Sequence, residues 1–211
     1  MAKTLKEEFL NLPNMLTMLR IVAIPPFIVL CFKGDPMSSY WAALLFSLAA
    51  VTDVIDGWLA RRQGLVTVMG QFLDPLADKL IVMAALVMMV RLGRVASGLV
   101  ILLLAREFII NGLRTLAASE GMVIAAGQGG KWKTALQLTS ILCLITHYTY
   151  ELNFGFFKFE ANFGRVGTWL IWLSVIPSIW SAIEYFLGFL AVMTGKEERA
   201  KAKAKAAAAQ A

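Results

Sequence analysis

The sequence predicts an all-α integral membrane protein with six transmembrane helices, a short N-terminal interfacial helix and both termini in the cytoplasm. Hydrophobic residues make up 59% of the 211 residues, and the mean hydropathy of +0.70 is too high for an ordinary soluble domain. The apolar runs are continuous, whereas the strands of a membrane barrel alternate over about ten residues. Because only helices or closed barrels satisfy backbone polar groups in lipid, we expect these runs to be helices.

Six stretches are long enough to cross about 30 Å of hydrocarbon as helix. They cover approximately residues 15–33, 40–60, 72–91, 95–115, 132–150 and 168–193. Pro25 and Pro26 interrupt the first stretch, the sequence around Gly34-Asp35-Pro36 predicts an outer turn, and residues 151–167 predict a longer outer loop. Together the six stretches predict one membrane domain over residues 1–195, followed by a basic, low-complexity tail over residues 196–211.

The positive charges predict the orientation, because cytoplasmic loops carry an excess of Lys and Arg. With the N-terminus inside, the cytoplasmic regions hold Lys3, Lys6, Arg61, Arg62, Arg114, Lys131, Lys133 and the tail, and the outer loops hold Lys33, Arg91, Arg94, Lys158 and Arg165.

Residues 2–12 place apolar side chains on one face and predict an interfacial helix, with a plain leader into the first span as the alternative. For the tail, a solvated segment is favoured over attraction to anionic lipid headgroups.

Four aspartates lie where the second span ends and the third begins, on the expected cytoplasmic side. Asp53 and Asp56 are three residues apart, and Gly70, Asp74 and Asp78 are spaced by four, so each set shares one helical face. Pro75 is tolerated in the first turn of a helix, which predicts that the third span begins near Asp74.

Clustered carboxylates oppose one another's ionisation unless a cation neutralises them. Oxygen ligands with no His or Cys nearby favour Mg²⁺ or Mn²⁺, and four carboxylates can hold two ions of the kind that assist phosphoryl transfer. Helix caps or proton relays are the alternatives for one or two of these residues.

The pattern Asp53-x-x-Asp56-Gly57-x-x-Ala60-Arg61, followed by Gly70-x-x-x-Asp74-x-x-x-Asp78, resembles the signature of the CDP-alcohol phosphotransferase family. The resemblance implies six transmembrane helices, a homodimer, and transfer of a phosphoalcohol group from a CDP-linked donor to a hydroxyl acceptor with release of CMP.

The same resemblance assigns the residues their roles. It implies that Asp53 and Asp74 bridge two metal ions, that Asp56 and Asp78 complete their shells, and that Asp78 is the general base. The positions that would contact the CDP donor are Gly57, Ala60, Arg61 and Thr67, with Asn14 and Thr17 completing the nucleotide pocket.

The second half of the chain carries basic residues that predict an anionic acceptor. The stretches Ala105–Arg114 and Gly130–Gln137 contain Arg106, Arg114, Lys131, Lys133 and Thr134, which are the candidate ligands of an acceptor phosphate. These stretches resemble the bacterial phosphatidylglycerophosphate synthase branch of the family, which implies CDP-diacylglycerol as donor, sn-glycerol 3-phosphate as acceptor and a bacterial cytoplasmic membrane.

Two alternatives remain open at this point. One is another acceptor, inositol phosphate or serine, and the other is a divalent-cation transporter, which would place acids near the bilayer midplane in several helices. Membrane lipid is an expected partner and nucleic acid is not. The single histidine, His147, falls near the outer end of the fifth span and is expected to be interfacial rather than catalytic.

Overall fold

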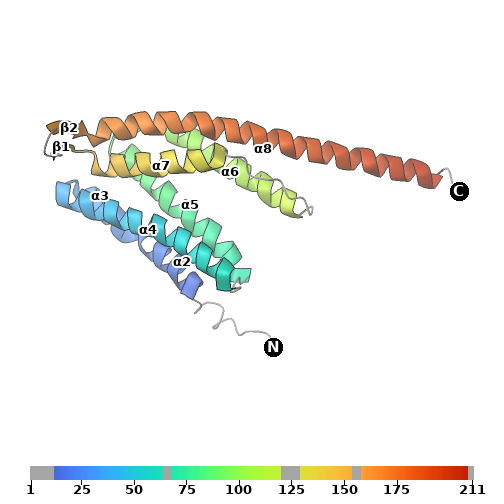
Figure 1. The fold of residues 1–211 in the computed structure, drawn as a ribbon, viewed down its shortest axis with the longest axis horizontal. Helices are drawn as coiled ribbons and strands as arrows, with labels where there is room; N and C mark the ends of the chain where they lie inside the picture. The colour runs from blue at the N-terminus through green and yellow to red at the C-terminus, as the bar shows by residue number, and fades with distance from the viewer. Residues whose placement is uncertain (1–11, 64–67, 120–128, 154–157, 209–211) are drawn as a thin grey trace. The chain divides into compact units, whose positions relative to one another are not determined.

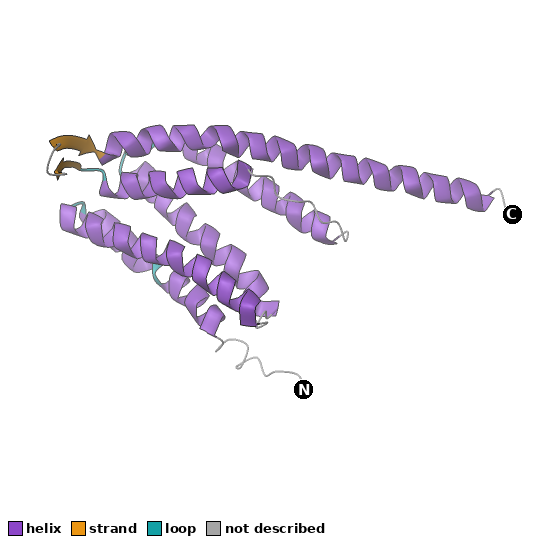
Figure 2. Ribbon diagram, in the orientation of Figure 1, coloured by secondary structure: helices purple, strands orange, loops and turns teal. Residues whose placement is uncertain are grey.

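Helices account for most of the chain, and one short hairpin of strands separates the last two of them (Figures 1 and 2). The structure is a computed structural model that describes residues 12–63, 68–119, 129–153 and 158–208. Within these ranges, side chains are not described for residues 12, 13, 54–72, 74, 75, 129, 131, 152–159 and 196–208. The elements are α2 (Leu12–Val22), α3 (Ile24–Lys33), α4 (Pro36–Gln63), α5 (Val68–Arg91), α6 (Ser97–Ser119), α7 (Gly129–Thr146), β1 (Thr149–Asn153), β2 (Lys158–Asn162) and α8 (Phe163–Ala208).

Each of the six predicted spans coincides largely with helix, so the helical character of these stretches is confirmed. Among the described residues, two helical stretches are long and apolar enough to cross a membrane, Asn14–Lys33 and Phe163–Gly195. The number of crossings therefore stays a prediction. The predicted helix over residues 2–12 lies almost wholly outside the described residues.

The first predicted span is interrupted at Ala23, between α2 and α3, as its proline pair indicated. Pro25 and Pro26 occupy the start of α3, where a missing N–H is tolerated. The Ala23 amide still donates to the Leu19 carbonyl at 2.9 Å, and the Phe27 amide donates to the Ala23 carbonyl at 3.1 Å. The two helices therefore remain linked by backbone hydrogen bonds across the interruption.

The predicted turn between the first two spans is confirmed. Gly34 has φ of 71°, a left-handed conformation that suits glycine after a helix, and α4 begins at Pro36. The Asp35 carboxylate accepts a hydrogen bond of 2.8 Å from the Ser38 amide, which satisfies one of the unpaired amides at the start of α4. The Ser38 hydrogen bonds lower the pKa of Asp35.

Asp35→Ala is expected to lower the midpoint of thermal unfolding, because the first turn of α4 loses its cap. Since the pKa of Asp35 is lower in the folded than in the unfolded chain, this stabilisation is present above about pH 4 and is lost as the pH falls below that value. Asp35→Asn keeps a capping oxygen and is the control. Equal midpoints for the Ala variant and the wild type at pH 7 would contradict the assignment.

The third span begins earlier than predicted. Helix α5 starts at Val68, so Pro75 lies inside the helix and the expectation of a start near Asp74 is wrong. A proline at that position removes the hydrogen bond to the Gln71 carbonyl, and the helix continues through it. The fourfold spacing of Gly70, Asp74 and Asp78 already favoured one continuous helix over all three positions.

The chain forms two compact units, and the first comprises residues 1–100 and 138–171. In this unit α2 packs against both α4 and α5, and α3 packs against the same two helices (Figure 1). The rings of Phe27 on α3 and Phe46 on α4 lie 6.1 Å apart in the core. Helix α2 is therefore held against the two helices that carry the aspartates.

Helices α7 and α8 approach each other closely at Gly167, within the same unit. A Cβ atom at Gly167 would lie 2.9 Å from the Leu144 amide nitrogen and 3.0 Å from the Ser140 carbonyl oxygen. Both are backbone atoms of a helix, so they cannot move aside as the end of a flexible side chain would. Glycine is thus required there for the two helices to pack.

Gly167→Ala is expected to lower the thermal unfolding midpoint of the purified protein by several degrees, because overpacking typically costs about 1–3 kcal/mol. Gly195→Ala, on the same helix, is the matched control, since nothing described lies within 4 Å of a Cβ there. An unchanged midpoint in Gly167→Ala would show that α7 and α8 do not pack as described.

A β-hairpin replaces part of the predicted outer loop. Strands β1 and β2 pair antiparallel, with Thr149 opposite Asn162 and Asn153 opposite Lys158. The prediction of a fifth span reaching residue 150 is therefore wrong, and the stretch predicted as an outer loop over residues 151–167 contains most of both strands and the start of α8. Helix α7 ends at Thr146, because His147 adopts φ of 31° and cannot continue a right-handed helix.

The second unit comprises residues 101–137 and 172–211. Its core includes the buried side chains of Ala117 on α6 and Phe189 on α8, with Leu113 packed against them. Helix α8 continues through most of the predicted basic tail to Ala208, a helical extension that the low-complexity sequence had not been used to predict. The Ala- and Lys-rich composition explains this, since both residues favour helix.

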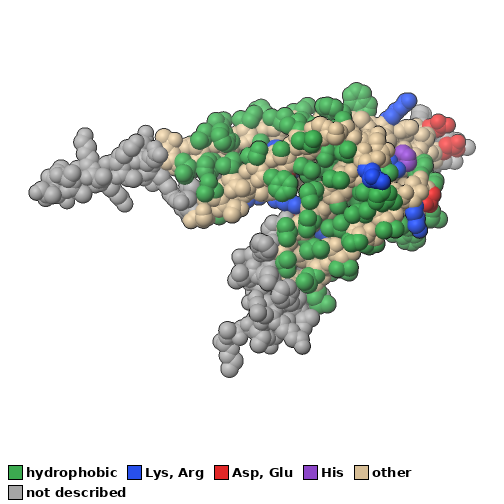
Figure 3. All heavy atoms as spheres, turned by 180° about the vertical axis from the view of Figure 1, so that it is seen from behind, with side chains coloured by type: hydrophobic (Ala, Val, Ile, Leu, Met, Phe, Trp, Pro, Cys, Tyr) green, Lys and Arg blue, Asp and Glu red, His purple; other side chains and the backbone are tan. Residues whose placement is uncertain are grey.

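Many large apolar side chains of the helices are exposed (Figure 3). On α8, Trp169 is 78% exposed, Ile176 65% and Trp180 64%. Apolar surface of this extent is unusual for a soluble monomer and is expected where helices face lipid.

Candidate active site

The aspartate motif occupies the last turns of α4 and the first half of α5, and these helices contact each other. Asp53 is partly buried on α4, and Asp78 is exposed on α5. The helical backbone that each half of the motif required is therefore present. The side chains of Asp56, Gly57, Ala60, Arg61, Asp74 and the whole of Thr67 lie outside the described residues.

One face of α2 is polar and fully buried. Asn14, Thr17 and Arg20 follow one another at three-residue steps and are 2%, 0% and 2% exposed. Met18 and Leu19 on the same helix are 41% and 62% exposed, so the usual arrangement of apolar inside and polar outside is reversed. Because α2 packs against α4 and α5, its buried polar face lies toward these two helices.

Arg20 connects this polar face to the first aspartate of the motif. Its Nη1 atom lies 2.6 Å from Oδ1 of Asp53, and the two residues are 33 positions apart in the chain. The Arg20 side chain is 1% exposed, so its charge needs a partner, and Asp53 provides one. The guanidinium also offsets part of the negative charge that the aspartates would accumulate.

The donor chemistry of the motif suits a hard divalent cation. Asp53 and Asp78 supply carboxylate oxygens, and neither is fully buried, so ions and substrate can reach both. Among the residues with described side chains, no three His, Cys, Asp or Glu residues come together. The side chains of Asp56 and Asp74, two of the four predicted ligands, lie outside the described residues.

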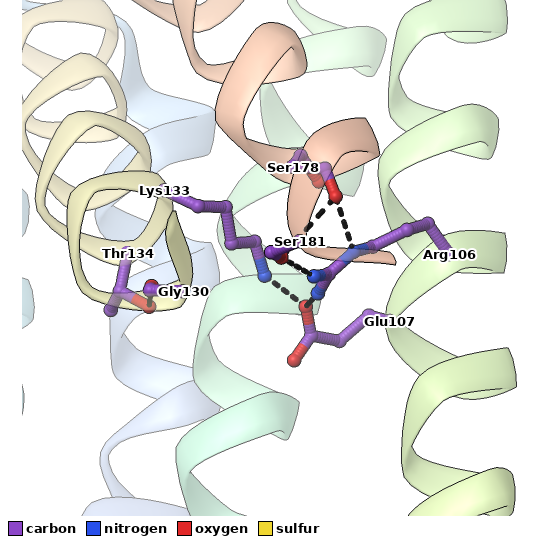
Figure 4. Close-up of polar contacts among 7 residues, drawn as sticks. All are labelled: Arg106, Glu107, Gly130, Lys133, Thr134, Ser178 and Ser181. Atoms are coloured by element: carbon purple, nitrogen blue, oxygen red, sulfur yellow. Dashed lines mark hydrogen bonds and ion pairs between the residues drawn. The ribbon is translucent and has the colours of Figure 1, made fainter. Parts of the chain in front are cut away.

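A second polar cluster lies in the other unit, formed by Arg106 and Glu107 of α6, Lys133 of α7, and Ser178 and Ser181 of α8 (Figure 4). We call it the α6–α8 cluster. Arg106 donates through Nε to the Ser178 carbonyl at 3.0 Å and through Nη2 to the Ser181 hydroxyl. Glu107 accepts from Lys133 and lies 3.4 Å from Arg106 Nη1 through the same oxygen, Oε2.

The α6–α8 cluster has the features of an anion site. Its formal charge is +1, from two cations and one carboxylate, and the Arg106 and Lys133 side chains are only 13% and 8% exposed. The serine contacts fix the plane of the Arg106 guanidinium before any ligand arrives. A preorientated guanidinium and an ammonium that share one acidic oxygen can hold a phosphate oxygen in the same way.

The remaining candidates for the acceptor phosphate lie outside this cluster. The exposed Arg114 places its guanidinium carbon 5.7 Å from the centre of the Tyr185 ring. Thr134 is exposed, and its hydroxyl donates to the Gly130 carbonyl at 3.0 Å. The side chain of Lys131 is outside the described residues. Of the four candidates with described side chains, the structure brings together Arg106 and Lys133.

The sequence interpretation missed Arg20, Glu107, Ser178 and Ser181 as site residues. Arg20 could have been found, because it continues the three-residue spacing of Asn14 and Thr17. The charge of Arg106 required a partner, but nothing in the sequence indicated that α8 would supply a serine carbonyl and a serine hydroxyl.

A sequence profile of the CDP-alcohol phosphatidyltransferase family matches residues 10–180. Relatives named CDP-diacylglycerol–glycerol-3-phosphate 3-phosphatidyltransferase include one from Bacillus subtilis, 37% identical over 83% of this chain and 93% of the relative. Others are from Rickettsia bellii, 35% identical over 88% of this chain and 91% of the relative, and from Haemophilus influenzae, 34% identical over 83% and 91%. The chain therefore belongs to the CDP-alcohol phosphatidyltransferase family.

Proposed function

We propose that this protein transfers the phosphatidyl group of CDP-diacylglycerol to sn-glycerol 3-phosphate, giving phosphatidylglycerophosphate and CMP. The single observation that carries the proposal is the match over most of the chain to relatives named for this reaction. The complete aspartate motif on α4 and α5 supports the reaction type, and the α6–α8 cluster supports a phosphorylated acceptor.

The reaction exchanges one phosphorus–oxygen bond for another. A hydroxyl oxygen of glycerol 3-phosphate bonds to the phosphorus that carries diacylglycerol, and the bond from that phosphorus to the bridging pyrophosphate oxygen breaks. CMP leaves with the bridging oxygen and its electron pair, and the hydroxyl proton passes to a base. We assign the base to Asp78, which is exposed on α5 and able to reach an incoming hydroxyl.

The polar face of α2 and the motif would bind the donor. We assign the nucleotide to Asn14 and Thr17, which are buried against the aspartate helices, and to Gly57, Ala60, Arg61 and Thr67. Arg20 would hold the carboxylate of Asp53 in a fixed orientation through their 2.6 Å contact. Orientation and charge stabilisation supply much of the catalysis in reactions of this kind.

We further propose that Asp53, Asp56, Asp74 and Asp78 hold two divalent cations, Mg²⁺ or Mn²⁺. Bound there, such ions supply positive charge to the pyrophosphate and to the departing CMP. The four aspartates would set the position of this positive charge. Arg20 would limit the repulsion among the carboxylates when a cation is absent.

For the acceptor, Arg106 and Lys133 would bind the phosphate of glycerol 3-phosphate. Glu107 holds these two cations together in the free protein, and the incoming phosphate would replace its Oε2 atom as their shared acceptor. Free serine, the alternative acceptor, carries no phosphate and would not offer Arg106 and Lys133 a phosphate oxygen. Arg114, Lys131 and Thr134 remain candidate contacts to the acceptor.

We place the protein in a bacterial cytoplasmic membrane, with six spans, both termini inside and the aspartates at the cytoplasmic surface. Residues 1–195 would form the membrane domain and residues 196–211 a basic tail. Exposed apolar side chains on the helices support the membrane environment. We also propose that the protein is a homodimer.

An acceptor panel tests the function. Purified protein is mixed with CDP-diacylglycerol, Mg²⁺ and one acceptor at a time: sn-glycerol 3-phosphate, serine, inositol phosphate or no acceptor. CMP release is expected only with glycerol 3-phosphate. Release with serine or inositol phosphate alone would refute the assigned acceptor, and no release with any of the four would refute the transferase itself.

A further inference from the structure

A cavity of about 480 Å³ lies where the α5–α6 turn, the end of α7 and the start of α8 meet, all within the first unit. Arg94, His147 and Arg165 line it, and Asp and Glu are absent from its described lining. The aspartate site is distant, because Asp78 and the end of α5 at Arg91 are separated by 13 residues of helix, roughly 20 Å at 1.5 Å each.

His147 carries two unfavourable features at this cavity. Its φ of 31° is rare for a residue with a side chain, and its buried Nδ1 atom has no hydrogen-bond partner among the described residues. Backbone strain and an unpaired buried nitrogen each destabilise a fold, and residues of this kind cluster at binding sites. An anionic oxygen in the cavity would give the Nδ1–H tautomer its missing acceptor.

Arg94 and Arg165 supply fixed positive charge beside that nitrogen. Arg94 donates through Nη1 to the Leu144 and Ile145 carbonyls at 2.8 and 2.9 Å, which fixes its guanidinium at the end of α7. No contact described for Arg94 uses its Nε or Nη2. The Arg165 amide donates to Oδ1 of Asn162 at 2.9 Å, so Arg165 lies in the first turn of α8, where the helix dipole also favours an anion.

The surroundings indicate which anion fits. Arginine recognises phosphate through paired hydrogen bonds, and the volume accommodates a phosphate with part of a headgroup. Trp169 lines the cavity and is 78% exposed, as tryptophan is at membrane–water boundaries.

We propose that this cavity binds a phosphate group, carried by an anionic phospholipid headgroup or by free phosphate, at a site separate from the reaction. Arg94, Arg165 and the Nδ1 atom of His147 contact its oxygens. Because the chain contains a single histidine, its imidazole reports directly on occupancy.

The test uses full-length protein without a histidine tag, labelled with ¹⁵N at histidine and held in uncharged micelles. Short-chain phosphatidylglycerol, phosphatidylcholine of the same chain length, and inorganic phosphate are titrated separately while the imidazole resonances are recorded. A saturable shift with phosphatidylglycerol assigns the site to lipid, and one with inorganic phosphate alone assigns it to the free ion. No saturable shift with either, or an equal response to phosphatidylcholine, would overturn the proposal.

Two variants separate binding from folding. Arg165→Gln removes an exposed charge and is expected to weaken the response about tenfold without changing the thermal unfolding midpoint. Arg91→Gln is the matched control. Arg91 is at the end of α5, three positions before Arg94, but its guanidinium carbon lies 4.7 Å from the centre of the Phe32 ring. Equal weakening in both variants would mean that overall charge, rather than the cavity, attracts the anion.

Discussion

Asp78→Asn is expected to reduce the rate of CMP release by about 10²–10⁴-fold, the usual contribution of a general base. Asparagine has nearly the size and shape of aspartate, so the helix keeps its packing while the side chain can no longer accept a proton. Donor binding should be largely retained, because Asn14, Thr17 and the other aspartates are unchanged. The measurement pairs single-turnover CMP release with equilibrium binding of CDP-diacylglycerol.

Glu184→Gln provides the matched control for this loss of one carboxylate. Glu184 is exposed on α8 and accepts a hydrogen bond of 2.7 Å from Trp180, so its neutral variant should turn over like the wild type. A rate in Asp78→Asn within threefold of the wild type would rule out Asp78 as the base. Loss of donor binding in that variant would instead make Asp78 chiefly a metal ligand.

Arg106→Gln is expected to raise the KM for glycerol 3-phosphate by about 10–100-fold, while the binding of CDP-diacylglycerol stays near that of the wild type. The variant removes the guanidinium that α8 holds in place and leaves Lys133 alone with Glu107. The Ser178 carbonyl also loses its donor, so the thermal unfolding midpoint must be measured beside the kinetics.

Arg114→Gln is the comparison that separates the cluster from general basicity. Arg114 lies on the same helix and was an equal candidate from the sequence, but its described contact is with the Tyr185 ring. We expect the KM for glycerol 3-phosphate to rise less in Arg114→Gln than in Arg106→Gln. A larger effect at Arg114 than at Arg106 would contradict the assignment of the acceptor phosphate to the α6–α8 cluster.

The sequence predicted the helices well, including the two that carry the aspartate motif, because these helices follow from local patterns. Continuous apolar runs indicated the helices, and glycine and proline at residues 34–36 indicated the turn. The start of α5 was misplaced because a proline in a helix interior is rare, and a packed helix overrode that preference at Pro75. The hairpin was missed because its strands are only five residues each.

The partners of the charged residues could not be predicted, because they depend on packing between distant segments. Arg20 and Asp53 are 33 positions apart, and Arg106 and Ser181 are 75 apart. Spacing alone also treated Arg106 and Arg114 as equivalent, although one is held by α8 serines and the other lies over a tyrosine ring. The cavity at Arg94 and His147 arises from a positive φ and a helix end that no residue pattern indicated.

The fate of a labelled acceptor distinguishes transfer of the phosphatidyl group to glycerol 3-phosphate from hydrolysis of the donor. Purified protein is incubated with CDP-diacylglycerol, Mg²⁺ and ¹⁴C-labelled sn-glycerol 3-phosphate, and label in the lipid phase is measured together with CMP. We expect one labelled lipid for each CMP released, and formation of both products slowed by the same large factor in Asp78→Asn. CMP release with all the label left in the aqueous phase would contradict the proposed transfer.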